Sequence, residues 1–205
     1  MKVHTSQTLI SDVDEALVKR ARTGSSNAFD QLVRRHQSAV RAFLCRMVQE
    51  PSLADDLAQE TFIKAWKNLS RWRGADQAGG SFRGWLFSIS VHAAHDQRRG
   101  HTRAQRRDTD WLADQDQVSS QETSLAAKLD LDKILQALSP DQRLVVALCF
   151  GAGLSHAEAA QALSMPLGTV KSHAQRGRDR AIEVMRDLRP ATLGAKLDAL
   201  ESKQP

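Results

Sequence analysis

The chain has 205 residues, enough for one large or two small domains, and carries 29 basic and 24 acidic residues for a net charge of +5. No uninterrupted apolar run approaches the ~20 residues that span a bilayer, and residues 1–16 lack the apolar segment of a secretory signal, so we expect a cytosolic protein without membrane insertion. Cys45 and Cys149 have no CxxC or Cys/His spacing; they are most simply buried thiols, and a redox switch between them is the alternative.

Helical periodicity dominates the chain, and no segment shows the alternation of a strand. We predict an all-α fold of two small helical bundles joined by a flexible acidic linker. The helices predicted for the first bundle cover residues 11–22, 27–49, 51–69 and 81 onward. Ser11 and Ser81 are the expected caps of the first and fourth helices. The side chains expected to face this core include Phe29, Leu32, His36, Phe43, Phe62, Trp66, Phe82, Trp85 and Leu86.

The composition changes over residues 108–122, which contain several acidic residues and no basic one, and this change predicts a linker. An amphipathic helix is expected over 123–137. Ser139 and Gln142 then form a capping box, with proline at the first helical position, which opens a helix to about Phe150. The last fifteen residues carry no clear signal.

Residues 153–182 carry the signals of a helix-turn-helix. Ser155 and Glu158 form a capping box that starts a helix near His156, with Ala157, Ala160 and Leu163 at inward spacing. Residues 164–166 interrupt this helix, because Pro166 cannot continue it. A stripe of small and apolar residues marks the inward side of the second helix: Val170, Ala174, Gly177, Ala181 and Val184.

The opposite face of the second helix carries hydroxyls, an amide and cations. These residues are Thr169, Lys171, Ser172, Gln175, Arg176 and Arg178. A helix in a DNA major groove requires this chemistry: Lys171 and Arg178 suit phosphates, whereas Ser172, Gln175 and Arg176 suit base edges. For any single residue, the alternative is a solvated basic face.

Three further segments give the sequence a family resemblance. They read ADDLAQETFIKAWKNL at 54–69, SFRGWLFSIS at 81–90 and DQRR at 96–99, and they precede LSPDQRLVVALCFGAGLSHAEAAQALSMPLGTVKSHAQRGR at 138–178. Together they resemble a bacterial RNA polymerase sigma factor of the extracytoplasmic-function type, over roughly residues 11–186. The resemblance implies a first domain at 8–107 that binds core polymerase and recognises and melts the −10 element. A linker at 108–122 connects it to a second domain at 123–188, which binds the −35 duplex. Residues 189–205 form a tail.

By this resemblance, residues 55–69 dock on the clamp helices of the polymerase's largest subunit. The sequence suits such docking, because a polar acidic ridge lies opposite two aromatic residues on the same helix; an ordinary solvated face is the alternative. The expected polymerase-binding residues are Asp55, Asp56, Gln59, Glu60, Phe62 and Trp66. The other implied partners are the flap of the second-largest subunit, promoter DNA and an anti-sigma factor, with no small-molecule substrate, cofactor, metal or catalysis.

The fourth helix and the preceding loop match the family's −10 region. Arg71, Trp72 and Arg73 combine cationic and stacking groups suited to an unstacked base, and five arginines between 98 and 107 suit phosphates. The expected −10 contacts are Arg71, Trp72, Arg73, His92, Asp96, Arg98, Arg99 and Arg103. The family commonly has Arg-Asn where this chain has Val91-His92, and some relatives have an aromatic residue at Gln175, so no promoter consensus transfers. The acidic linker is expected to thread through the polymerase's basic cleft.

Two other functional classes remain at this point. The segment GTVKSH also resembles the helix-turn-helix of response-regulator output domains, which would make the chain a stand-alone DNA-binding regulator, although the front half lacks the strands of a receiver. An enzyme is the second alternative, with His92, His95 and Asp96 as metal ligands, but no further cluster completes such a site.

Overall fold

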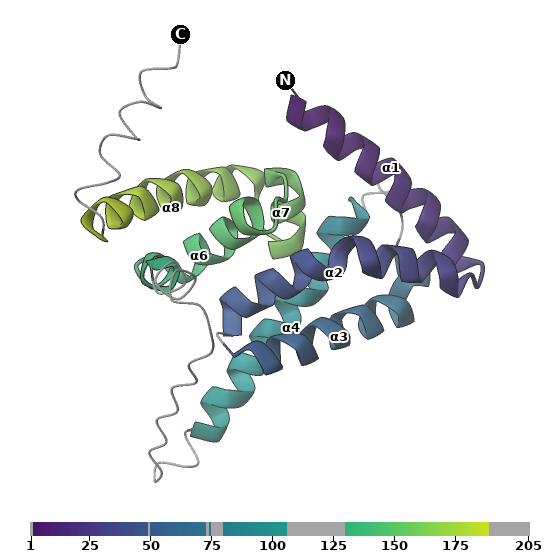
Figure 1. Ribbon diagram of the computed structural model, residues 1–205, viewed down its shortest axis with the longest axis horizontal. Coiled ribbons are helices and arrows are strands. Elements are labelled where there is room, and N and C mark those ends of the chain that lie inside the picture. Colours follow the sequence, from purple (N-terminus) through teal and green to yellow (C-terminus); the bar gives the residue numbers. More distant parts are fainter. Residues whose placement is uncertain (1, 49, 73, 75–79, 106–129, 189–205) are drawn as a thin grey trace. The chain divides into compact units, whose positions relative to one another are not determined.

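The computed structural model describes residues 2–48, 50–72, 74, 80–105 and 130–188, which form helices and no strand (Figure 1). The predicted all-α class is therefore confirmed. The chain separates into two compact units: residues 1–111 with 147–170, and residues 112–146 with 171–205. Among the helices in this part of the chain, none combines the length and the apolar content of a membrane span.

The first unit is built on four long helices. These are α1 (Lys2–Arg22), α2 (Ser26–Val48), α3 (Pro51–Asn68), followed by the 3-10 turn η1 (Leu69–Arg71), and α4 (Phe82–Gln105). The π-helical turn η3 (Ala147–Gly151), α7 (His156–Leu163) and the first residues of α8 (Leu167–Leu188) belong to the same unit. Helix α2 is central, because it packs against α1, α3 and α4; Figure 1 shows α2 and α3 side by side.

The helix starts confirm one predicted cap and correct another. Ser81 Oγ accepts a hydrogen bond from the Gly84 amide at 3.0 Å, as predicted for the cap of α4. Helix α1 instead begins at Lys2, so the prediction that Ser11 starts it is wrong. Residues 2–10 contain no glycine or proline, the residues that commonly interrupt a helix, so the helix can extend to the N-terminal side of Ser11.

The core of the first unit consists mainly of the predicted residues. Leu32, Phe43 and Leu86 are fully buried, and Phe43 packs edge-on to Phe87 with 5.7 Å between ring centroids. Trp66 differs from the prediction, since 42% of it is exposed. One side of its ring contacts Phe29 at a centroid distance of 4.8 Å, and the rest of the ring is exposed to solvent.

In the second unit, residues 130–136 are helical, and α6 (Pro140–Val146) packs against α8. The capping box that opens α6 is confirmed: the Gln142 amide donates to Ser139 Oγ at 3.3 Å, and the Ser139 amide donates to Gln142 Oε1 at 3.1 Å. A Cβ on Gly177 would lie 2.6 Å from Val146 Cγ2, so the contact of α8 with α6 requires a glycine there. Residues 123–129, the predicted linker at 108–122 and the tail at 189–205 lie outside the described residues.

Candidate polymerase and nucleic-acid interfaces

The first helix of the helix-turn-helix begins and ends where the sequence predicts, and the second begins after the predicted break. Ser155 Oγ accepts from the Glu158 amide at 3.2 Å, and Glu158 Oε2 accepts from the Ser155 amide at 2.8 Å, which completes the capping box of α7. Ser164 ends α7 in the left-handed region with φ 52°, and α8 starts after Pro166. The short connection is the one expected for a helix-turn-helix.

The inward side of α7 differs from the prediction. Ala159 and Ala162 are buried, whereas Ala157, which was expected to face inward, is exposed. Alanine occurs at four positions of this short helix, so its apolar pattern does not determine which side is buried.

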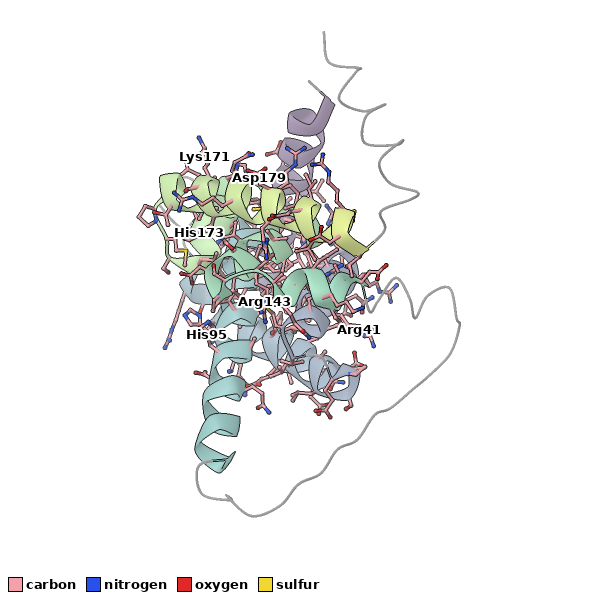
Figure 2. All side chains as sticks on the ribbon, turned by 90° about the vertical axis from the view of Figure 1, so that its left-hand side faces the viewer. Arg41, His95, Arg143, Lys171, His173 and Asp179 are labelled. Atoms are coloured by element: carbon pink, nitrogen blue, oxygen red, sulfur yellow. The ribbon has the colours of Figure 1, made fainter. Side chains whose placement is uncertain are left out.

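Helix α8 presents the predicted polar face. Val170, Ala174 and Gly177 are buried, as the small and apolar stripe requires. Of the six predicted DNA-binding residues, Ser172 is half-buried and the others are exposed: Thr169, Lys171, Gln175, Arg176 and Arg178. The Lys171 side chain projects outward from α8 in Figure 2.

The cations on α8 differ in whether they already have partners. The side chains of Lys171, Arg176 and Arg178 make no hydrogen bond or ion pair among the described residues, so they are available to a ligand. Gln175 Nε2 donates to Asp179 Oδ1 at 3.0 Å, so this amide must exchange its partner before it can pair with a base edge. Arg180 is paired with Glu183 at 2.5 Å.

On α3, the predicted acidic ridge reaches the surface. Asp56, Gln59 and Glu60 are exposed, while Asp55 is half-exposed and accepts a hydrogen bond from Arg41 of α2. This hydrogen bond lowers the pKa of the Asp55 carboxyl and raises the pKa of the Arg41 guanidinium. Arg41 is labelled in Figure 2. Two carboxylates of the ridge therefore already have cationic partners, because Glu60 also forms an ion pair with Lys64 at 2.7 Å.

The apolar residues next to this ridge are not the predicted pair. Phe62 is buried and belongs to the core, so it does not offer a contact surface. Ile63 was not predicted, although 53% of it is exposed; it precedes Trp66 by three residues, so the two share one face of α3. The sequence signal that could have identified it is its spacing: Ile63 follows Glu60 of the acidic ridge by three residues, which places both on the same side of the helix. Ile63 and Trp66 together give α3 an exposed apolar pair.

The predicted −10 residues before α4 divide into exposed and buried groups. Arg71 is exposed at the end of η1, and Arg73 lies outside the described residues. Trp72 is buried and meets Phe82 edge-on, with 6.0 Å between ring centroids and planes at 89°. The structure therefore gives no support to base stacking by Trp72, because the indole is packed into the core and has no free ring face.

The remaining −10 candidates lie on α4. His92 and Asp96 are exposed, as is His95, which Figure 2 labels. Positions 98, 99 and 103 are helical, but the side chains of Arg98, Arg99 and Arg103 lie outside the described set, as do Arg106 and Arg107 entirely. Within the part of the chain that the structure describes, no group of three or more His, Cys, Asp or Glu side chains could hold a metal ion, so the metal-enzyme alternative gains no support.

The sequence matches two family descriptions, Sigma-70 region 2 over residues 32–104 and Sigma-70, region 4 over residues 128–180. It is 35% identical over 173 residues to RNA polymerase sigma factor NccH of Alcaligenes xylosoxydans xylosoxydans, which covers 81% of this chain and 91% of that protein. It is 30% identical over 183 residues to the ECF RNA polymerase sigma-E factor of Haemophilus influenzae, which covers 81% and 92%. The sigma factor RpoE of Bartonella quintana, solved with the anti-sigma factor NepR, aligns with a TM-score of 0.64 and 30% identity over 77% of this chain and 96% of that one.

The all-helical fold and the exposed helix-turn-helix define a transcription factor that binds DNA. The chain belongs to the sigma-70 family, as a sigma factor of the extracytoplasmic-function type. It acts with RNA polymerase to direct transcription from specific promoters, and proteins of this family are regulators rather than enzymes.

Proposed function

We propose that the exposed face of α3 binds core RNA polymerase at the clamp helices, that Arg71 and α4 contact the −10 element, and that α8 reads the −35 duplex. The functional modules are residues 8–107 and 123–188, joined by the linker at 108–122, and the second module also meets the flap of the second-largest subunit. The factor works in the cytoplasm without catalysing a reaction. Joining both modules to one polymerase raises promoter affinity by effective concentration.

The observation that carries the polymerase assignment is the exposed pair Ile63 and Trp66 beside the acidic ridge. Large apolar side chains are enriched at the centres of protein interfaces, and a charged rim around them supports specific docking. Both residues lie on a helix whose opposite side is fixed in the core by Leu57 and Ala65. The apolar pair is thus held on a rigid element.

Binding of the full chain to core polymerase tests this assignment. Ile63→Ala and Trp66→Ala should each weaken the complex about tenfold, a loss of about 1.4 kcal/mol. Val13→Ala on α1 is the matched control, because Val13 is also an exposed apolar residue. Equal affinities for all three variants would contradict the proposal.

For the promoter, we propose −10 contacts from Arg71, His92 and Asp96, together with Arg98, Arg99 and Arg103, and without a stacking role for Trp72. Arg99→Ala should impair promoter opening more than duplex binding, whereas Arg176→Ala should lose discrimination of the −35 sequence. In vitro transcription with core polymerase on genomic fragments, with mapped start sites, tests both. Equal effects of the two variants on closed and open complexes would contradict this division.

We also propose an anti-sigma partner for this chain, since its relative RpoE was solved with one. The acidic linker is proposed to follow the polymerase's basic cleft. Neutralising the linker aspartates, Asp108, Asp110, Asp114 and Asp116, should then weaken the holoenzyme at low salt. A salt titration in which affinity does not change would contradict this role.

A further inference from the structure

A single carboxylate joins the N-termini of two helices that lie far apart in the sequence. Glu158 Oε1 accepts a hydrogen bond from Ser81 Oγ at 2.9 Å, and Oε2 of the same side chain accepts from the Ser155 amide. Ser81 Oγ in turn accepts from the Gly84 amide of α4. The cap of α4 and the capping box of α7 are therefore one hydrogen-bonded network within the first unit.

The backbone of α4 is shaped to receive α7 at this point. A Cβ on Gly84 would overlap Gln161 Oε1 and would lie 3.3 Å from the Glu158 carbonyl oxygen. A Cβ on Gly80 would overlap the same Gln161 side-chain oxygen. The two glycines thus form a notch that the Gln161 side chain occupies; a Cβ at either position would displace that side chain, and a bulky side chain at Gly84 would also press on the Glu158 backbone of α7.

Arg83 extends the contact to the loop that precedes α7. Its guanidinium donates to the carbonyl of Gly153 at 3.0 Å and also to the carbonyl of Ala152. Ala152 and Gly153 directly follow η3, so the Arg83 side chain of α4 provides hydrogen-bond donors for the backbone carbonyls at the end of that turn. These bonds use one donor on each terminal nitrogen of Arg83 and hold its guanidinium against the loop.

We propose that Ser81, Arg83 and the Gly80–Gly84 notch form an intramolecular lock that holds α7 against α4 and keeps the free sigma factor closed. This inference rests on the proposed assignment of α4 to the −10 element and of the helix-turn-helix to the −35 element. Those elements lie about 25 base pairs apart, which is roughly 85 Å along B-form DNA. A chain that binds both cannot keep Ser81 within hydrogen-bond distance of Glu158, so the lock must open before promoter recognition.

The chemistry of the lock suits reversible opening. Its bonds join side chains that are only partly buried, Ser81, Arg83 and Glu158, so water replaces the lost partners on opening. If a ligand binds only the open form, its apparent affinity equals the intrinsic affinity multiplied by the fraction of molecules that are open. Polymerase or DNA therefore binds the minor open form and shifts the equilibrium toward it.

The matched pair Ser81→Asp and Ser81→Asn tests the lock. Both residues cap helices well, so α4 keeps its start, and the two differ chiefly in charge. Asp places a second carboxylate against Glu158 and should open the lock, whereas Asn can donate to Glu158 and should keep it closed. Glu158→Gln retains the capping box of α7 and should restore the closed form in the Ser81→Asp background.

Spin labels on the full chain report the closed form directly. They are attached at Ser38→Cys on α2 and Ala157→Cys on α7, two exposed positions, after Cys45→Ala and Cys149→Ala. We expect one short distance in the Ser81→Asn chain, a broad and longer distribution in Ser81→Asp, and recovery in Ser81→Asp with Glu158→Gln. Gly84→Leu, which fills the notch without removing a cap, should open the chain independently. Identical distance distributions in Ser81→Asn, Ser81→Asp and Gly84→Leu would overturn the lock.

Binding to core polymerase separates this inference from the proposed function. If the lock is present, Ser81→Asp should bind about fivefold more tightly than Ser81→Asn. Equal binding by the two variants would overturn the inhibitory role while leaving the proposed function intact. Absence of binding by every variant would overturn the proposed function, and the spin-label distances would still decide whether the lock forms.

Discussion

Asp14 of α1 and His36 of α2 form a buried pair in which carboxylate Oδ2 lies 2.7 Å from imidazole Nε2. The other oxygen of Asp14 accepts from Arg35 Nε at 2.8 Å, and the ring of His36 contacts Phe82 of α4 at a centroid distance of 5.8 Å. One carboxylate therefore ties α1 to α2 at a place where α4 also meets the core. The pair explains how a histidine can occupy a position in the apolar stripe of α2.

Removal of the Asp14 carboxylate should destabilise the fold. Asp14→Ala leaves the buried imidazole without its partner, and we expect a loss of about 1–3 kcal/mol in the free energy of unfolding. Urea denaturation followed by circular dichroism measures this loss. Asp12→Ala is the control, since Asp12 is exposed on the same helix and should change stability by no more than about 0.5 kcal/mol. If Asp14→Ala lost no more stability than Asp12→Ala, the buried pair would not contribute to the free energy of unfolding.

Trp72 should behave as a core residue. Trp72→Ala should cost about 3–5 kcal/mol of stability, because it opens a cavity beside Phe82. Trp72→Phe should recover most of this loss, since the indole Nε1 is buried without a hydrogen-bond partner and its removal leaves no group unsatisfied. Promoter opening by the folded Trp72→Phe protein should match the wild type. A normally stable Trp72→Phe chain that fails to open a promoter would instead assign the indole to DNA.

The helix starts and the buried stripes could be predicted from sequence where strong local chemistry specifies them. The caps at Ser81, Ser139 and Ser155 each place a side-chain oxygen over the amide of a first turn, an interaction that depends only on neighbouring residues. The burial of Val170, Ala174 and Gly177 follows from helical spacing in the same way.

The errors at Trp66 and Trp72 have another cause, because the environment of each residue depends on distant parts of the chain. Both tryptophans lie near the end of α3. Phe29 of α2 covers only one side of Trp66, whereas Trp72 is buried in the core against Phe82 of α4. The contact of Glu158 with Ser81 spans 77 residues and has no sequence signal, because each residue is already explained by the cap of its own helix.

The unpaired cations of α8 should separate positioning from base recognition. Arg176→Ala should cost about 1–3 kcal/mol in binding to the cognate −35 duplex and relax discrimination there. Lys171→Ala should weaken binding to all sequences alike and reduce the salt slope by about 1. Arg180→Ala is the control, because Arg180 is already paired with Glu183. Fluorescence anisotropy over a salt series measures all three, and a uniform loss for Arg176→Ala would reassign that residue to a phosphate.

The thiol of Cys149 should react slowly with alkylating agents. Burial, and secondarily the charge of Glu158, raises the pKa of Cys149 from 9.0 to about 11. At pH 8 the thiolate fraction is then about a hundredfold smaller than that of an ordinary thiol, which disfavours a redox switch at this residue. In a Cys45→Ala chain, the rate of iodoacetamide modification should keep rising as the pH approaches about 11. Glu158→Gln should lower the pKa and increase the rate at pH 8, because it removes a nearby negative charge. Modification at pH 8 as fast as that of an exposed cysteine peptide, with no effect of Glu158→Gln, would show that neither burial nor this carboxylate controls the thiol.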